Sequence, residues 1–230
     1  MVQQLISNFP LEDFEQYPDS DGQPMADNTK QFRWIVVIKE NLERLFASDP
    51  NVFVAGDLLW YPVEGEPKVR MAPDALVVFG RPKGDRGSYQ QWKENNIAPQ
   101  VVFEILSPGN RPGEMLRKLN FYQRYGVEEY YIYDPDSEAL TGLQRSGQSL
   151  QLIDEMAGWV SPRLGIRFVP EGEEGAEGLE IYRPDGEKFL TFVELGEQLS
   201  AERMERQQDQ QRIQSLEAKL RELGVDPGEI

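Results

Sequence analysis

The sequence predicts an α/β protein with a mixed sheet, in which a helix, a meander of strands, a buried strand, a second helix and another buried strand follow one another. Residues 29–48 place apolar side chains at helical spacing, and residues 101–106 form an almost wholly apolar, β-branched run. A second helical pattern at 114–125 separates that run from the next strand-like run at 129–134. This order of elements is typical of a sheet that is covered by helices.

The first helix is expected to begin after Asp27 or Asn28, which are both good N-cap residues, and to stop at Asp49-Pro50. Turn residues then separate four strand-like pieces, at 52–55, 57–61, 69–71 and 74–79. Residues 80–96 are polar and contain glycine, so they are expected to form a loop with a short helix at 89–94.

The buried strand at 101–106 contains one charged residue, Glu104. Because side chains alternate along a strand, Val102 and Glu104 lie on one face and Phe103 on the other, so Glu104 is expected to point into a covered layer. Gly126 is a natural residue to end the following helix. Further hairpin strands are expected at 141–143, 150–153 and 166–169.

Composition divides the chain into an acidic N-terminal arm at 1–27, a domain at 28–170, an acidic linker with short strands at 171–194 and a C-terminal amphipathic helix at 195–230. Residues 1–27 contain six acidic residues and no basic one, and residues 171–230 contain sixteen acidic and seven basic residues. The middle of the chain is nearly neutral. In the terminal helix, apolar residues alternate by three and four between 213 and 223, so this helix either supports a homodimer or docks on its own domain.

The 230-residue chain has no His, no Cys and a net charge of −16. This composition excludes a Ser-His-Asp triad, a Cys nucleophile and a zinc finger, because each of these needs an imidazole or a thiolate. Oxygen ligands would select a hard cation such as Mg²⁺ or Mn²⁺. No apolar run approaches the ~20 residues of a membrane helix, and the first residues lack the basic region of a secretory signal. We therefore expect a cytoplasmic protein with no membrane partner.

Asp74, Glu104 and Lys118 form the candidate site. Burying an unpaired carboxylate is costly, so Glu104 needs a partner. One interpretation is an ion pair with Lys118 or Arg117. The other is a divalent metal held by Glu104 and Asp74 from adjacent strands, with a backbone carbonyl and waters. Lys118 would then orient or deprotonate an attacking water, or stabilise charge on a phosphate.

The runs APDALVVFG, PQVVFEILSPGN and KLNFYQRYGVEEYYIYDPD, in this order across residues 70–136, resemble the Uma2-like family, a large family especially abundant in cyanobacteria. That family belongs to the PD-(D/E)XK nuclease superfamily. The resemblance therefore implies a restriction-endonuclease-like core over 28–170, with extra hairpins and a C-terminal helix outside the motifs. It also implies a Mg²⁺- or Mn²⁺-dependent endonuclease acting on DNA, with RNA as the alternative substrate.

Carried over to this chain, the resemblance makes Asp74 and Glu104 metal ligands, with the carbonyl of Ile105 as a third ligand. It makes Lys118 the catalytic lysine. The usual E-x-K pattern would place lysine at 106, where this chain has Leu106, whereas in Uma2-like proteins the lysine lies on the following helix, which matches Lys118.

Three other acidic or aromatic residues receive a structural interpretation. Tyr122 shares a helix face with Lys118 and is interpreted as core packing. Glu40 and Glu43, on the first helix, are interpreted as solvent-exposed rather than as site acids. Family members often carry a His near the start of that helix, and this chain has none. The alternative function is a nuclease fold without catalysis that serves as a binding or assembly module.

Overall fold

The structure is a computed structural model that describes residues 16–20, 22, 24–170, 175–176 and 178–222. Most of the predicted acidic arm and the start of the predicted linker lie outside these residues, as does the end of the terminal helix from Leu223 onwards. The chain divides into two compact units, Met1–Phe189 and Leu190–Ile230. Among the described residues, no helix is both long enough and apolar enough to cross a membrane.

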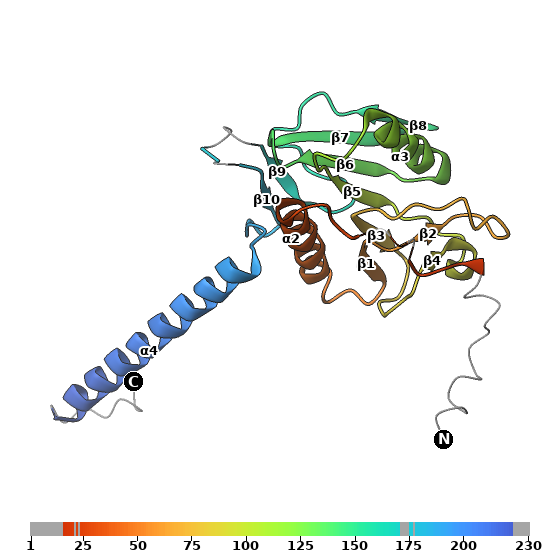
Figure 1. The fold of residues 1–230 in the computed structure, drawn as a ribbon. Coiled ribbons are helices and arrows are strands. Elements are labelled where there is room, and N and C mark those ends of the chain that lie inside the picture. The colour runs from red at the N-terminus through yellow and green to blue at the C-terminus, as the bar shows by residue number, and fades with distance from the viewer. Residues whose placement is uncertain (1–15, 21, 23, 171–174, 177, 223–230) are drawn as a thin grey trace, which may run out of the picture. The chain divides into compact units, whose positions relative to one another are not determined.

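A six-stranded mixed sheet forms the centre of the first unit (Figure 1). Its strand order is β1-β3-β5-β6-β7-β8. The strands are β1 (Val52–Gly56), β3 (Ala75–Phe79), β5 (Val101–Ile105), β6 (Glu129–Asp134), β7 (Ala139–Ser146) and β8 (Ser149–Leu152). Within this sheet β5 and β6 run parallel, and the other neighbours run antiparallel. The predicted α/β fold with a mixed sheet is confirmed.

Helix α3 (Pro112–Tyr125) joins β5 to β6, because parallel neighbours need a crossover connection. It begins two residues before the predicted start, since Pro112 has its φ already set for the first helical turn. It ends at Gly126, whose φ of 97° is the left-handed conformation that glycine adopts without a steric penalty.

Helix α2 (Thr29–Leu45) begins as predicted after Asn28, whose side chain accepts a hydrogen bond from the backbone N–H of Gln31 at 2.9 Å. The helix buries Ile35, Ile38 and Leu42 against the sheet. Phe32, which the apolar pattern assigned to the same stripe, is 49% exposed. The buried stripe is therefore narrower than the sequence pattern.

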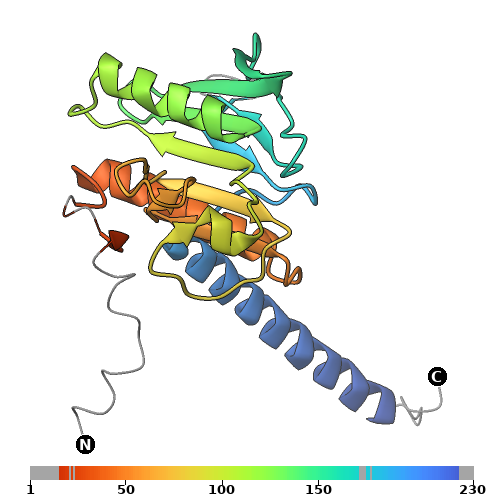
Figure 2. The same ribbon diagram turned by 90° about the vertical axis from the view of Figure 1, so that its right-hand side faces the viewer.

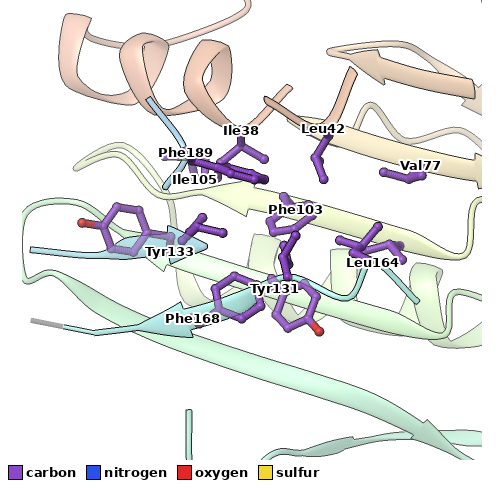
Figure 3. Close-up of a cluster of buried hydrophobic side chains, with 14 of the residues drawn as sticks. Ile38, Leu42, Val77, Phe103, Ile105, Tyr131, Tyr133, Leu164, Phe168 and Phe189 are labelled. Carbon is purple, nitrogen blue, oxygen red and sulfur yellow. The ribbon is translucent and has the colours of Figure 1, made fainter. Parts of the chain in front are cut away.

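Two apolar layers cover the two faces of the sheet. On one face, α2 packs with β9 (Arg167–Val169) and β10 (Glu180–Tyr182); on the other, α3 packs with β2 (Trp60–Tyr61) and β4 (Tyr89–Gln90). Figure 2 shows α3, in green, and α2, in red to orange, with strands of the sheet between them. Figure 3 shows the α2 side, where Ile38 and Leu42 lie near Phe103 of β5.

Three segments differ from the predicted strands and helix. The predicted strand at 57–61 shortens to β2 because Asp57 adopts a left-handed φ of 48°, which no strand accommodates. In place of the predicted strand at 69–71, Met71 forms an isolated bridge with Trp60. Residues 89–94 form β4 followed by the 3₁₀ helix η1 (Gln91–Glu94) rather than a single helix.

The described part of the N-terminal arm is anchored by Tyr17, which is 4% exposed. Its ring packs against Tyr61 and Trp92, with centroid distances of 5.3 and 4.9 Å. Its hydroxyl accepts a hydrogen bond from the N–H of Gly65 at 2.6 Å. These contacts attach residues near 17 to the β2 region.

The second unit contains α4 (Phe192–Glu222), none of whose residues is buried. The helix begins before the predicted residue 195 because Thr191 and Glu194 form reciprocal hydrogen bonds at its start. The side chain of Glu194 accepts from the N–H of Thr191 at 2.7 Å, and the N–H of Glu194 donates to Thr191 Oγ1 at 3.2 Å.

Candidate active site

The candidate residues meet near the carboxyl end of β5, where the N-terminal ends of α2 and α3 also lie. Ala75 pairs with Phe103 in the antiparallel β3–β5 ladder, so Asp74, one residue before β3, comes next to Glu104. Alternation along β5 places Glu104 in a covered layer, as predicted, and this layer is the α3 face because the neighbouring Phe103 packs in the α2 layer. The sheet thereby brings together the carboxylates of Asp74 and Glu104, which lie far apart in the sequence.

Glu104 is 2% exposed, and both of its carboxylate oxygens accept hydrogen bonds from α3. Lys118 Nζ donates to Oε2 at 2.6 Å, and the Tyr122 hydroxyl donates to Oε1. Lys118 and Tyr122 are one helical turn apart, so they present their polar ends to the same point. Of the two bases weighed from the sequence, Lys118 is the ion-pair partner, and Arg117 is exposed.

Tyr122 has a double role that its sequence position did not reveal. Its ring is fully buried and packs edge-on against Tyr130, with a centroid distance of 5.0 Å. Its hydroxyl also reaches Glu104. The prediction of core packing was therefore incomplete, since the same side chain also satisfies a buried carboxylate.

Asp74 is 8% exposed, and its Oδ2 accepts a hydrogen bond from the backbone N–H of Ile105 at 2.6 Å. Burial raises the pKa of Asp74 well above its usual range, and the negative charge of Glu104 raises it further. Burial also raises the pKa of Glu104, although Lys118 and Tyr122 oppose this shift. The pKa of Lys118 is raised because the charges of Glu104 and Asp74 outweigh the effect of its burial.

A cleft of about 340 Å³ opens beside Asp74. We call it the site cleft; it is lined by Pro24, Met25, Ala26, Asp27, Gln31, Asp57, Met71, Ala72, Asp74, Gly109, Asn110, Glu114 and Lys118. Four of the described lining residues are acidic and one, Lys118, is basic. The cleft therefore carries excess negative charge, which favours a cation.

Sequence reasoning missed Gln31 and Asp27, which enter this cleft from the start of α2. Gln31 Nε2 donates to the carbonyl of Ile105 at 2.8 Å, and Gln31 Oε1 accepts from the N–H of Asp27 at 2.8 Å. Ser107 Oγ donates to Asp27 Oδ2 at 2.5 Å. The available signal was local: Gln31 lies three residues after the N-cap Asn28, where Glu or Gln is common.

The two glutamates of α2 do not line the site cleft; Glu40 is exposed as predicted, whereas Glu43 is partly buried. Glu40 pairs with Lys39 at 3.0 Å, and Glu43 pairs with Lys83 at 2.9 Å. Asp57 does line the cleft, and its charge contributes to the raised pKa of Asp74.

The donor chemistry of the site fits a hard divalent cation. Asp74, Glu104 and the carbonyl of Ile105 supply oxygen atoms only, which are the donors that a hard divalent cation prefers. Glu104 has Lys118 as its counter-ion, and the Ile105 carbonyl is bonded to Gln31. Among the described residues, no group of three or more His, Cys, Asp or Glu side chains is arranged to hold a metal.

A mixed sheet with a helical crossover brings an acidic pair beside a helix lysine, which is the arrangement expected from the resemblance to a restriction-endonuclease-like core. Residues 11–166 match the model of the Uma2 family, which is described as "Putative restriction endonuclease". The match spans more than half of the sequence, so the chain belongs to the Uma2 family, and the resemblance stated from the sequence is confirmed.

Among the solved structures that are similar to this chain is "a putative nuclease belonging to DUF820" from Anabaena variabilis ATCC 29413. The two share 17% sequence identity, over 66% of this chain and 87% of that chain, with a TM-score of 0.46. No curated protein matches the chain.

Proposed function

We propose that the protein is a Mg²⁺- or Mn²⁺-dependent endonuclease that hydrolyses phosphodiester bonds in DNA. The observation that carries this proposal is the pair of buried carboxylates, Asp74 and Glu104, beside a single lysine at the site cleft. A purely structural role would bury the Asp74 carboxylate at a cost, because it accepts a hydrogen bond from Ile105 but forms no ion pair with a basic residue among the described residues. The proposal retains the cytoplasmic location expected from the sequence.

In this proposal Asp74, Glu104 and the carbonyl of Ile105 hold the metal. When bound, the metal would supply an activated water and offset charge on the scissile phosphate. The N–H of Ile105 keeps Asp74 in place, and Tyr122 keeps Glu104 in place. Lys118 enters from α3 and presents a positive charge to the cleft, where it would stabilise charge on the phosphate.

The negative cleft also explains why a cation is needed before DNA can approach. Asp27, Asp57, Asp74 and Glu114 line it against the single positive charge of Lys118. Phosphate groups bind where positive charge replaces their counter-ions, so an uncompensated acidic cleft would repel them. Metal binding would change the sign of this interaction.

A second candidate function is a nuclease-fold module without catalysis. The observation that favours it is that both oxygens of Glu104 already have partners in α3, so that the buried acid is satisfied without a metal. In this case the domain would bind or assemble with other molecules through its surface.

Calorimetric titration with Mn²⁺ separates the two functions without requiring the right nucleic-acid substrate. We expect the wild type to bind Mn²⁺ and Asp74→Asn to bind at least about ten-fold more weakly, because the variant removes a charged ligand. Asp154→Asn makes the same chemical change at an exposed residue outside the site cleft and should bind like the wild type.

Cleavage assays on plasmid DNA and on single-stranded RNA then identify the substrate. We expect metal-dependent nicking of DNA that is lost in Asp74→Asn and kept in Asp154→Asn. A folded wild type that neither binds Mn²⁺ nor cleaves would contradict the nuclease proposal and favour the module without catalysis. Cleavage of RNA alone would retain the chemistry and correct the substrate.

A further inference from the structure

Gln31 connects α2 to the end of the strand that carries Glu104. We propose that Gln31 is a positioning residue of the candidate active site: it fixes the backbone of Ile105 and, through that backbone, the carboxylate of Asp74. The coupling to metal affinity rests on the proposed function, whereas the positioning itself is a property of the metal-free protein.

The hydrogen bonds of Gln31 use both ends of its amide. The side chain is buried, with 7% exposure; Nε2 donates to the carbonyl of Ile105 at 2.8 Å, and Oε1 accepts from the N–H of Asp27 at 2.8 Å. The N–H of the same Ile105 donates to Asp74 Oδ2 at 2.6 Å. Ile105 therefore accepts a hydrogen bond from Gln31 at its carbonyl and donates one to Asp74 from its N–H.

Helix capping accounts for only half of this arrangement. A Gln at this position commonly turns back to satisfy an N–H before the helix, and Oε1 does so with Asp27. The donation from Nε2 contributes nothing to the cap. It reaches a carbonyl 74 positions along the chain, at the site.

Ile105 is the last residue of β5, so its carbonyl lies where the ladder with β6 ends. At that end the next N–H, of Leu106, donates to Tyr133 at 2.7 Å. The direction of the Ile105 carbonyl is fixed from the other side of the chain by Gln31. A carbonyl oxygen has two lone pairs, so the bond from Gln31 leaves one acceptor position for a cation.

A neutral amide suits this position better than a charged side chain. The site cleft is already lined by the carboxyl groups of Asp27, Asp57 and Asp74. An acid at 31 would add repulsion, and a lysine would compete with a bound cation. Gln31 donates a hydrogen bond without changing the charge of the site.

The test combines amide hydrogen exchange in the metal-free protein with Mn²⁺ titration. Gln31→Met removes the amide at nearly constant side-chain length, and Gln31→Asn keeps the amide but is one methylene shorter. Gln100→Met is the matched control, because Gln100 precedes the opposite end of β5 and accepts a side-chain hydrogen bond from the N–H of Phe79 at 2.8 Å.

We expect the amide of Ile105 to exchange at least about ten-fold faster in both Gln31 variants, while the amide of Phe103 in the middle of β5 keeps its wild-type rate. Mn²⁺ should bind about 10–100-fold more weakly, the loss typical when a group that orients a metal ligand is removed. Gln100→Met should leave both the exchange of Ile105 and the Mn²⁺ affinity unchanged.

Wild-type exchange at Ile105 in folded Gln31→Met and Gln31→Asn would overturn the inference, whatever the metal does. So would faster exchange at Ile105 in Gln100→Met, since the effect would then be a general weakening of β5. If the wild type neither binds Mn²⁺ nor cleaves, but Ile105 exchanges faster in the Gln31 variants, positioning by Gln31 stands and the proposed function fails.

Discussion

At the scale of single residues, the site is organised by the cost of burying charge. Glu104 is nearly inaccessible to solvent and is stabilised by one cation, Lys118, and one hydroxyl, Tyr122. Asp74 has a weaker set of partners and a strongly raised pKa. Active sites commonly tolerate such unfavourable charges because ligands relieve them.

Replacing Asp74 should stabilise the metal-free protein at neutral pH. The pKa of Asp74 is raised above its usual 3.8 in the folded state, so the folded protein holds this proton more tightly than the unfolded chain does. Wild-type stability therefore falls as pH rises from about 4 through the raised pKa, and Asn at this position avoids the loss. We expect Asp74→Asn to raise the free energy of unfolding by about 1 kcal/mol or more at pH 8, and by less at pH 5.

Urea denaturation with EDTA at both pH values measures this difference, and Asp154→Asn is the control that should match the wild type. A gain for Asp74→Asn that is equal at pH 5 and pH 8, or larger at pH 5, would show that the raised pKa does not act on stability.

Replacing Lys118 should separate its role in stability from its role in chemistry. Lys118→Met leaves Glu104 buried without a cation, which typically costs about 3–5 kcal/mol. Loss of the lysine raises the pKa of Glu104 further, so the destabilisation should be smaller at pH 5 than at pH 8.

The same variant should keep Mn²⁺ binding, because a competing cation is removed, and lose at least about 100-fold in DNA cleavage, the size expected for a positioned charge. Lys68→Met, at an exposed position outside the site cleft, is the control for both measurements. Full cleavage by Lys118→Met would remove this residue from the proposed mechanism.

At the scale of elements, α3 determines the site because it carries both partners of Glu104. The helix begins at Pro112 and ends at Tyr125, with Gly126 as its C-cap shortly before β6 begins at Glu129. Its two termini therefore control how Lys118 and Tyr122 are presented to β5.

A pair of glycine substitutions tests this element. Gly126→Ala should cost about 1 kcal/mol, because a φ of 97° is unfavourable for any side chain. Gly113→Ala, in the first turn of α3, should be neutral or stabilise by up to about 0.5 kcal/mol, since nothing lies within 4 Å of the added methyl group. Thermal unfolding of both variants measures the difference, and equal stabilities would contradict the assigned helix end.

At the scale of the whole molecule, charge and apolar burial are distributed unevenly. Every residue of the three buried clusters lies between Tyr17 and Phe189, and no residue of α4 is buried. Ile213 and Leu216 of α4 are 54% and 52% exposed. We propose that α4 mediates a homodimer, in which two sites would be available for the two strands of DNA.

Deletion of residues 190–230 should convert the dimer into a monomer and leave the unfolding midpoint of the first unit unchanged. Ile213→Lys combined with Leu216→Lys should also give a monomer, because charges at exposed apolar positions oppose helix pairing. Sedimentation equilibrium of the three proteins decides the matter, and a monomeric full-length chain would exclude this dimer.

The sequence by itself determined the local features of the protein. Apolar periodicity located α2, α3 and the central strands, and alternation along β5 placed Glu104 on the covered face, because these properties depend on near neighbours. The absence of His and Cys restricted the site to oxygen ligands and lysine. The motif resemblance identified the Uma2 family.

Only the tertiary structure decided which distant side chains meet. The choice of Lys118 over Arg117 as partner of Glu104 depends on how α3 packs on the sheet, and the contact of Gln31 with Ile105 joins residues 74 positions apart. The late start of the predicted strand at 57–61 also involves a distant contact, because the N–H of Asp57 donates to the carbonyl of Pro73. Strand register and helix packing are set by the whole core, so one-dimensional patterns do not contain these contacts.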